Sequence, residues 1–444
     1  MAPRASQSHA LAAESGQGGR ALVEWLSRQR AESAWVREQR LAAWEEFEQA
    51  PPPRYQRGIK GWWFTDLTTV RLERLRPLDL IGGRRAGLPT APPPRGLAGE
   101  LRFGDATLRG ASLVPGLQDQ GVYVADLATA VRERPDLVEP YLGRLAAPEG
   151  DKFAALAAAL WGNGLVFHVP AGVQIQLPVR CLLGLRSPAV ALGWRTLIVV
   201  ERGSSASFVE ELSSTPAGMG SLFSGVSEVY VGEGASLTYA GLEDWGHGVP
   251  GLSRRRATVA RDGRLRWFSA YLGGEKVRSD SRVDLAGPGA GLEASGLFYA
   301  EEHQHIDANA LVVHEAPRTT AEFLLRGAVK DAAHAAFAGT LRVPRGSQGT
   351  QSHLASHTLT LSDQARVDVV PSLEIAANDV RVGHGSAAGK LDEEQVFYLM
   401  SRGLPRTEAV RTLLRGFFEP ALARLPLPAA RTRVERAIEG KMSR

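Results

Sequence analysis

Histidine is the residue type in this sequence with the most chemistry to offer, because an imidazole can ligate a metal or move a proton near neutral pH. Three histidines, His303, His305 and His314, lie within the stretch EEHQHIDANALVVHE. In a strand, His303 and His305 project from the same face, a spacing that metal sites on β-scaffolds use. Glu301 and Glu302 precede them directly. The pattern therefore raises the hypothesis of a metal site on a β-strand.

The function that this pattern suggests is a metal-dependent β-fold enzyme similar to the cupins. The cupin pattern has a glutamate about four residues after its second histidine. Ala308 and Asn309 stand at that place here. Polar side chains also form ladders on β-surfaces without binding a metal. The metal-dependent β-fold enzyme therefore remains the second functional hypothesis.

A further histidine, His384, stands alone between Gly383 and Gly385. Such a residue is either a hydrogen-bonded turn residue or a functional one, since polar side chains set by a rigid scaffold often carry function. The chain before it alternates apolar and polar residues, and the chain after it is patterned as helix. We therefore predict a polar hinge over residues 383–386, with His384 at the junction of strand and helix.

The elements on both sides of this junction have distinct signals. Residues 367–375 carry apolar side chains at alternate positions, which is typical of half-buried strands. Asp392 is a good N-cap, Gln395 completes a capping box, and Gly403 is typical of a helix C-terminus. The expected helices cover residues 392–402, 405–418 and 429–441.

The middle of the chain, residues 164–382, consists of short apolar runs broken by Gly, Ser, Asp and Pro. Triplets such as Ala235-Ser236-Leu237 recur in similar contexts, with third residues at positions 208, 237, 265, 292 and 323, and a further match ends at 367. A repeat of about 28 residues indicates the stacked coils of a β-solenoid. A large β-sandwich also has short strands, but it has no reason to keep a register. We therefore expect a mainly β solenoid.

The rest of the chain predicts helical flanks. Residues 21–48 place apolar side chains at helical spacings, and residues 83–97 are typical of a linker. Short strands are expected near 101–103 and 121–124, and helices within 126–146 and 151–161. The expected domains are a disordered head (1–20), an N-terminal helical region with its linker (21–97), an α/β entry segment (98–163), the solenoid core (164–384) and a C-terminal helical domain (385–444).

Composition excludes several classes of protein. The 444 residues are 44% hydrophobic, which is ample for a core, and the net charge of +4 with interspersed acids and bases does not indicate a nucleic-acid surface. The single cysteine, Cys181, excludes a disulfide framework and a cysteine-ligated zinc or iron–sulfur site built from this chain alone. No signal peptide and no apolar run of about 18 residues is present. We expect a cytoplasmic protein that binds neither membrane nor nucleic acid.

Several motifs occur together and in order along the chain. Two early segments are RLAAWEEF at 40–47, followed by PPPR and WFTDL, and DKFAAL at 151–156, followed by VPAGV at 169–173. The last third contains PSLEI at 371–375, NDV at 378–380, His384-Gly385, GKLDEEQ at 389–395 and FYLMSRG at 397–403. Together these residues resemble the SufB/SufD family of iron–sulfur cluster assembly proteins, and its SufD branch in particular. The resemblance covers most of the chain.

This resemblance implies a right-handed parallel β-helix between N-terminal and C-terminal α-helical domains, which agrees with the repeat. It also implies a non-catalytic scaffold subunit. Such a subunit pairs with a SufB-like partner through the β-helix and binds a SufC-like ABC ATPase through its C-terminal helices. A further alternative is that the isolated chain pairs with a second copy of itself.

The resemblance also implies roles for particular residues. His384 would lie at the interface with the SufB-like subunit, where iron or a nascent iron–sulfur cluster is held, and no cofactor would be bound stably by this chain alone. SufD proteins often have Cys two residues before this histidine, but Val382 stands here. Iron ligation would then rest on His384 with carboxylates or with SufB residues. The expected ATPase-docking residues are Phe397, Tyr398, Arg402, Gly403, Val410, Leu413, Leu414 and Phe417.

Overall fold

The computed structural model describes residues 19–51, 65–68, 70, 72, 75–77, 93–148, 150–425 and 427–443. The expected disordered head therefore lies almost entirely outside the described residues, and so does most of the expected linker at 83–97.

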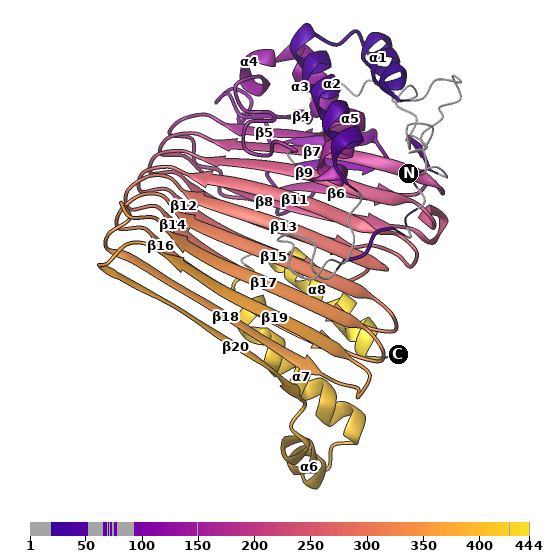
Figure 1. Ribbon diagram of the computed structural model, residues 1–444, viewed down its shortest axis with the longest axis vertical. Coiled ribbons are helices and arrows are strands. Elements are labelled where there is room, and N and C mark those ends of the chain that lie inside the picture. Colours follow the sequence, from indigo (N-terminus) through magenta and orange to yellow (C-terminus); the bar gives the residue numbers. More distant parts are fainter. Residues whose placement is uncertain are drawn as a thin grey trace, which may run out of the picture.

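The core is a parallel β-solenoid of about eight turns, in which each turn gives one strand to each of two facing sheets (Figure 1). We call the space between the sheets the lumen. Sheet A contains β5 (Trp161–Val169), β7 (Val190–Val200), β9 (Leu222–Val231), β11 (Gly251–Val259), β13 (Lys276–Leu285), β15 (His305–His314), β17 (His334–Val343) and β19 (Arg366–Ile375). Sheet B contains β6 (Val179–Leu185), β8 (Ser205–Ser214), β10 (Ser236–Asp244), β12 (Arg264–Tyr271), β14 (Gly291–Ala300), β16 (Thr320–Val329), β18 (Thr350–Thr360) and β20 (Val380–Lys390).

The lumen is filled because alternate residues of every strand point into it. Side chains at equal positions in successive turns stack on one another, as Phe208 does on Tyr239 at 6.3 Å between ring centroids. Phe208 also stacks on Phe167 of the facing sheet A at 5.5 Å. A single cluster of buried side chains runs through the turns from Leu101 to Leu354. The predicted solenoid is confirmed, and its alternating apolar pattern is the cause.

The repeat found in the sequence is the stacking of strands in sheet B. Leu237, Leu265 and Leu292 occupy one register position on β10, β12 and β14, as predicted. At the first position the predicted register is wrong by two residues, because Ala206 and not Phe208 pairs with Leu237.

The alignment is also wrong by two residues at its other end, where Ala321 and not Phe323 pairs with Leu292. A slip of two residues keeps every side chain on the same face, so an apolar pattern cannot detect it. The last match, ending at Val367, lies on β19 in sheet A and does not belong to this column.

The N-terminal end of the lumen is closed by short strands of the chain itself. Strand β2 (Gly99–Gly104) pairs with β6, β3 (Thr107–Leu113) pairs antiparallel with β2, and β4 (Tyr123–Asp126) pairs antiparallel with β5. A short β1 (Arg76–Pro77) pairs with β7. The strands expected near 101–103 and 121–124 are thereby confirmed.

Helices cover the outer face of sheet A at this end (Figure 1). They are α1 (Arg20–Gln29), α2 (Ala34–Gln49), α3 (Leu127–Glu133), α4 (Pro135–Val138) and α5 (Lys152–Leu160). They confirm the expected helices at 21–48 and 151–161, while only part of 126–146 is helical.

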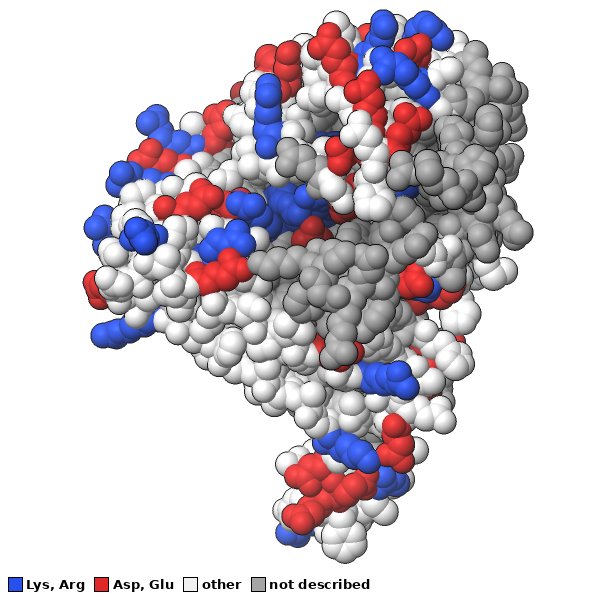
Figure 2. All heavy atoms as spheres, in the orientation of Figure 1, with Lys and Arg blue, Asp and Glu red and all other residues white. Residues whose placement is uncertain are grey.

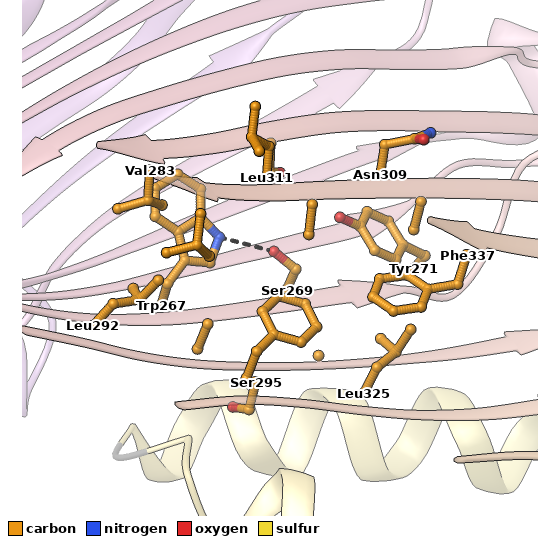
Figure 3. A pocket seen from close by; sticks show the side chains of 17 residues that line it. Trp267, Ser269, Tyr271, Val283, Leu292, Ser295, Asn309, Leu311, Leu325 and Phe337 are labelled. Carbon is orange, nitrogen blue, oxygen red and sulfur yellow. Dashed lines mark hydrogen bonds between the residues drawn. The ribbon is translucent and has the colours of Figure 1, made fainter. Parts of the chain in front are cut away.

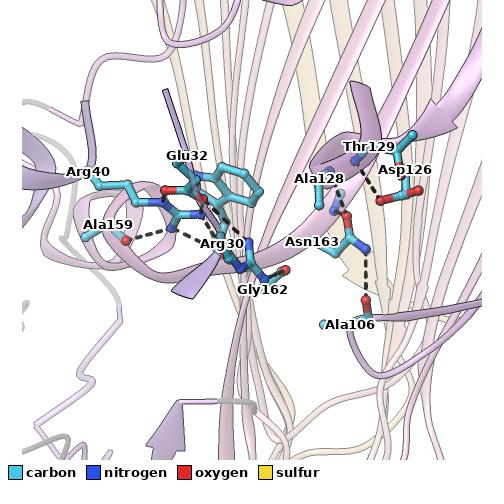
Figure 4. Close-up of polar contacts among 12 residues, drawn as sticks. Arg30, Glu32, Arg40, Ala106, Asp126, Ala128, Thr129, Ala159, Gly162 and Asn163 are labelled. Carbon is cyan, nitrogen blue, oxygen red and sulfur yellow. Dashed lines mark hydrogen bonds and ion pairs between the residues drawn. The ribbon is translucent and has the colours of Figure 1, made fainter. Parts of the chain in front are cut away.

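Arg40 ties these helices to the first turn of the solenoid (Figure 4). Its guanidinium donates to both carboxylate oxygens of Glu32 at 2.8 Å and to the carbonyl of Ala159 at 2.9 Å. It also lies 3.8 Å from the ring centroid of Trp161. Because both charged groups are buried and fully engaged, this contact fixes the helical region in one position.

The C-terminal helices are α6 (Glu393–Ser401), α7 (Arg406–Leu422) and α8 (Pro428–Met442), so the three predicted helices are confirmed. The Asp392 side chain caps α6 by accepting from the N–H groups of Glu394 and Gln395, and Gly403 has the positive φ of 94° expected after a helix. Helices α7 and α8 pack on the outer face of sheet B, whereas α6 projects past the last turn (Figure 1).

The predicted hinge at residues 383–386 is wrong. These residues lie inside β20, which continues to Lys390 in register with β18. Parallel pairing supplies the backbone hydrogen bonds here, so the glycines that suggested a turn are strand residues. His384 is therefore a strand residue and not a junction residue.

Candidate functional site

The C-terminal end of the solenoid, formed by β19 and β20, differs from the other turns because no described strand stacks on it. These strands are the last in sheets A and B, and along their outer edges no strand of the described chain pairs with them. Such edges present free N–H and C=O groups that can extend a sheet with another chain. We call this surface the open end.

Apolar side chains line the open end because its inward-facing residues have no following turn to cover them. Leu373 and Ile375 continue the inward columns of Leu341 and Val343, which are fully buried. Leu373 and Ile375 themselves are 37% and 42% exposed. An exposed apolar row on a sheet edge is typical of a surface that another protein covers.

His384 belongs to the same inward row. Its Cα pairs with that of Leu354, which is buried in the lumen, so both side chains point to the lumen side. Val382 also lies in this row and packs against the lumen core. His384 is nevertheless exposed, because no turn follows β20. The open end thus offers one accessible imidazole set in an apolar rim.

Among the described residues, this imidazole has no companion ligands. Across the parts of the chain that the structure describes, no three His, Cys, Asp or Glu side chains gather in a way that could hold a metal. Cys181 is buried on β6, and burial raises the pKa of its thiol well above the ordinary value. With strands about 4.8 Å apart, the seven strand spacings from β6 to β20 place Cys181 about 34 Å from His384. This thiol therefore cannot take the place left by Val382.

The expected ATPase-docking residues fall into two groups. On α6, Phe397 and Tyr398 are 72% and 57% exposed, and both Arg402 and Gly403 after it are also exposed. On α7, Leu414 is buried against sheet B, and Val410 and Phe417 pack against the same cluster.

The difference between the two groups follows from the placement of the helices. Helix α7 uses its apolar face to attach to the solenoid, and Leu413 there is only half-buried. Helix α6 has a single buried residue, Val396, and presents its aromatic side chains to solvent. The surface available for docking is therefore mainly on α6.

Charges on the visible face of the molecule are mixed in sign (Figure 2). Positive and negative side chains alternate around the N-terminal helices and gather again at α6. The sheet A face over the last turns is mostly uncharged on the same view. A surface of mixed charge is better suited to contacts with other proteins than to long-range attraction by an electrostatic field of one sign.

The three histidines of the enzyme hypothesis do not come together. His305 begins β15 and His314 ends it, so about 30 Å of extended strand separates them. They also point to opposite sides: His314 faces the lumen and donates to or accepts from Thr319 at 2.8 Å, whereas His305 lies on the outer face. His303 is an exposed turn residue. One metal cannot bind all three.

A cavity in the lumen is another place to look for a substrate site (Figure 3). It has a volume of about 40 Å³ and lies among Trp267, Ser269, Tyr271, Leu325 and Phe337. The Trp267 indole N–H donates to Ser269 at 3.0 Å inside it. Such a space has room for a few water molecules, whereas ligand sites are usually several hundred Å³.

Comparisons with known proteins agree with the fold and the motifs. Residues 186–417 match the family model described as "SUF system FeS cluster assembly, SufBD core domain", and residues 111–181 match the "SufBD protein N-terminal region". The chain is 32% identical to the iron–sulfur cluster assembly protein SufD of Bacillus subtilis over 423 residues, covering 94% of this chain and 96% of that protein. It is 27% identical to SufB of the same organism over 420 residues, covering 92% and 90%.

The chain therefore belongs to the SufB/SufD family of iron–sulfur cluster assembly proteins of the SUF system. Within this family it stands on the SufD branch, as its higher identity to SufD than to SufB indicates. No helix among the described residues is long and apolar enough to span a membrane.

Sequence reasoning missed two features of the site. The exposure of Leu373 and Ile375 was not foreseen, because a strand pattern alone does not show which turn is the last. The second is a contact between His305 and His334, which lie at the same register position on β15 and β17. Only the register of sheet A reveals that pairing, and the repeat was found in sheet B.

Proposed function

We propose that this chain is a non-catalytic scaffold subunit of a SUF-type iron–sulfur cluster assembly complex. It pairs with a SufB-like subunit through the open end and binds a SufC-like ATPase through its C-terminal helices. The observation that carries the proposal is the open end, which has two strand edges that no described strand pairs with and an exposed apolar row. A partner with the same solenoid fold would continue both sheets and bury that row.

Pairing at the open end would place His384 inside the interface. Iron or a nascent cluster is then cargo held between the subunits, and a nitrogen ligand of borderline softness suits iron. Because Val382 offers no thiol and the described residues gather no other ligands around His384, the remaining ligands come from the partner. In the absence of that partner, a second copy of this chain would cover the same surface.

The ATPase dock is assigned to α6 rather than to the buried face of α7. Phe397 and Tyr398 project from a short helix that stands clear of the solenoid. Aromatic side chains of this kind supply much of the binding energy of protein interfaces. Leu414 and Phe417 would contribute indirectly, by holding α7 on sheet B.

The dock is tested by co-expressing the chain with a SufB-like and a SufC-like protein. The double substitution Phe397→Asp with Tyr398→Asp should abolish co-purification of the ATPase and leave the SufB-like protein bound. Thr412→Asp, at an exposed position on α7, adds a charge away from the dock and should leave both partners bound. Retention of the ATPase by the double variant would move the dock off α6.

In the same co-expression, the open end is tested by charging its apolar row. Leu373→Lys with Ile375→Lys should release the SufB-like protein and keep the ATPase bound. Ser372→Lys is the matched control, since Ser372 lies between them but faces the other side of β19. If the double variant still binds the SufB-like protein as the control does, the open end is not the pairing surface.

A further inference from the structure

The outer face of sheet A carries a row of polar side chains on the opposite side of the sheet from the apolar row of the open end. His305 on β15 and His334 on β17 occupy paired positions. Asp368 lies on β19, two residues beyond Arg366, which is the register partner of His334. The neighbours of the two histidines, Ile306 and Ala335, are buried in the lumen core, so the histidines face outward. Thr65, from the N-terminal region, lies against this row. Four side chains from four separate segments thus meet at one place.

The hydrogen-bond partners fix where the protons of His305 lie. The Asp307 carboxylate forms an ion pair with Arg278 and accepts from the Thr65 hydroxyl at 2.6 Å. Thr65 has a single hydroxyl hydrogen, and that hydrogen is used on Asp307. At 3.0 Å from His305 Nε2, the Thr65 oxygen must therefore accept, and Nε2 of His305 carries a hydrogen.

The same reasoning applies to His334. Its Nε2 lies 2.7 Å from the Asp368 carboxylate, which accepts only, so this nitrogen also carries a hydrogen. In both rings the Nε2–H thus donates to a neighbouring oxygen, and the two Nδ1 atoms face each other at 3.1 Å. Because each ring carries a hydrogen on Nε2, the Nδ1 atoms of two neutral rings would both present lone pairs. Lone pairs at this distance repel unless a proton or a metal ion lies between them.

We propose that His305 and His334 chelate one divalent transition-metal ion of borderline softness, such as Zn²⁺, Co²⁺ or Fe²⁺, through their Nδ1 atoms. Two nitrogens on a tetrahedral ion at about 2.05 Å are about 3.3 Å apart, close to the separation already present. A metal-ligating histidine usually donates its other N–H to a carboxylate or another acceptor, as both rings do here. This site is independent of the scaffold role and of His384.

The solvent-exposed side of the histidine pair gives a metal ion access and leaves room for water ligands. The His334 side chain is 28% exposed and that of Asp368 is 49% exposed, so water can complete the coordination sphere. Because Thr65 orients one ligand, a bound ion would also hold residues 65–68 on sheet A. The site differs from the enzyme hypothesis, since His303 and His314 take no part in it.

The test uses the purified full-length chain and Co²⁺ as the probe. Wild type should bind one equivalent with visible d–d absorption, and Zn²⁺ should displace it. His305→Ala and His334→Ala should each lose this equivalent, and Asp368→Ala should keep the stoichiometry with an affinity about 10–100-fold weaker. His303→Ala is the matched control and should bind like wild type, and His384→Ala tests the open end as the alternative metal site.

Circular dichroism and thermal melting would establish that each variant is folded. If wild type takes up no Co²⁺, or if His334→Ala binds as wild type does, the pair holds a shared proton only and the proposal is overturned. Loss of the equivalent in His384→Ala, with His305→Ala unaffected, would place the metal at the open end and would equally overturn it.

Discussion

At its N-terminal end the lumen is closed by Leu101, Phe103 and Leu108 of β2 and β3, which are all buried. At its C-terminal end, Leu373 and Ile375 occupy equivalent inward positions and are exposed. Among the described residues, the strands β2, β3 and β4, two antiparallel pairings and five helices lie at the first end, and no strand or helix of this kind covers the second. This difference between the two ends is the basis of the proposal that a partner covers the second one.

The largest effect expected from this contrast is on the stability of the isolated chain. Phe103 packs edge-on against Trp194 at 4.8 Å between ring centroids and is 3% exposed. Phe103→Ala should lower the free energy of unfolding by about 3–5 kcal/mol, because it removes buried surface and leaves a cavity. Urea unfolding followed by circular dichroism measures this change.

The matched control is Leu373→Ala at the open end, where the truncated side chain is already partly in water. Its cost in the isolated chain should be about 1 kcal/mol or less. Similar losses at both positions would mean that the open end is packed in solution, and the contrast between the two ends would fail.

A second prediction compares two histidines that face the lumen, His314 in a closed turn and His384 at the open end. His314 is fully buried, its Nε2 has no hydrogen-bond partner among the described residues, and burial lowers its pKa to about 4. The folded state therefore binds fewer protons than the unfolded state, whose histidine titrates near pH 6.5. Stability that is present above pH 6.5 is lost as the pH falls towards 4, by about 3 kcal/mol from this group.

His314→Gln should make the unfolding free energy less dependent on pH between 6.5 and 4, while keeping a group that can bond to Thr319. Part of the dependence should remain, because the pKa of His305 is lowered to about 4 as well. His384→Gln should leave the pH dependence of the unfolding free energy as it is in wild type. Unfolding midpoints measured at several pH values in this window would decide, and parallel curves for His314→Gln and wild type would contradict the prediction.

Much of this architecture was open to prediction from the sequence, because it follows from local periodicity. Alternating residues predict the strands, the recurrence of triplets predicts the solenoid, and Asp392 predicts the start of α6. What failed depends on contacts between turns. The glycines around His384 suggested a hinge, but pairing with β18 makes them a strand. The sequence pattern also could not reveal the slip of two residues in the register of sheet B.

The candidate site also combines features that local sequence patterns predict with features that they do not. The motif residues led to the family, and the comparisons confirm it. The sequence did not show that Leu414 would be buried on sheet B while Phe397 stays exposed, since both belong to apolar helix faces. Nor did it show that His305 would meet His334 rather than His314. Helix placement and strand register decide these points, and neither is a local property of the chain.

The smallest effect on the chain itself, and the most specific one, is expected from His384→Ala. The side chain is exposed in the isolated chain, so its removal should leave folding and binding of both partners unchanged. The iron content of the assembled complex should fall if this imidazole is the ligand that the open end contributes, as proposed. Iron per complex after anaerobic reconstitution is the measurement. His353→Ala, one strand away and facing outward, is the control. Equal iron in both variants would reduce His384 to a structural residue of the rim and leave cluster binding to the partner alone.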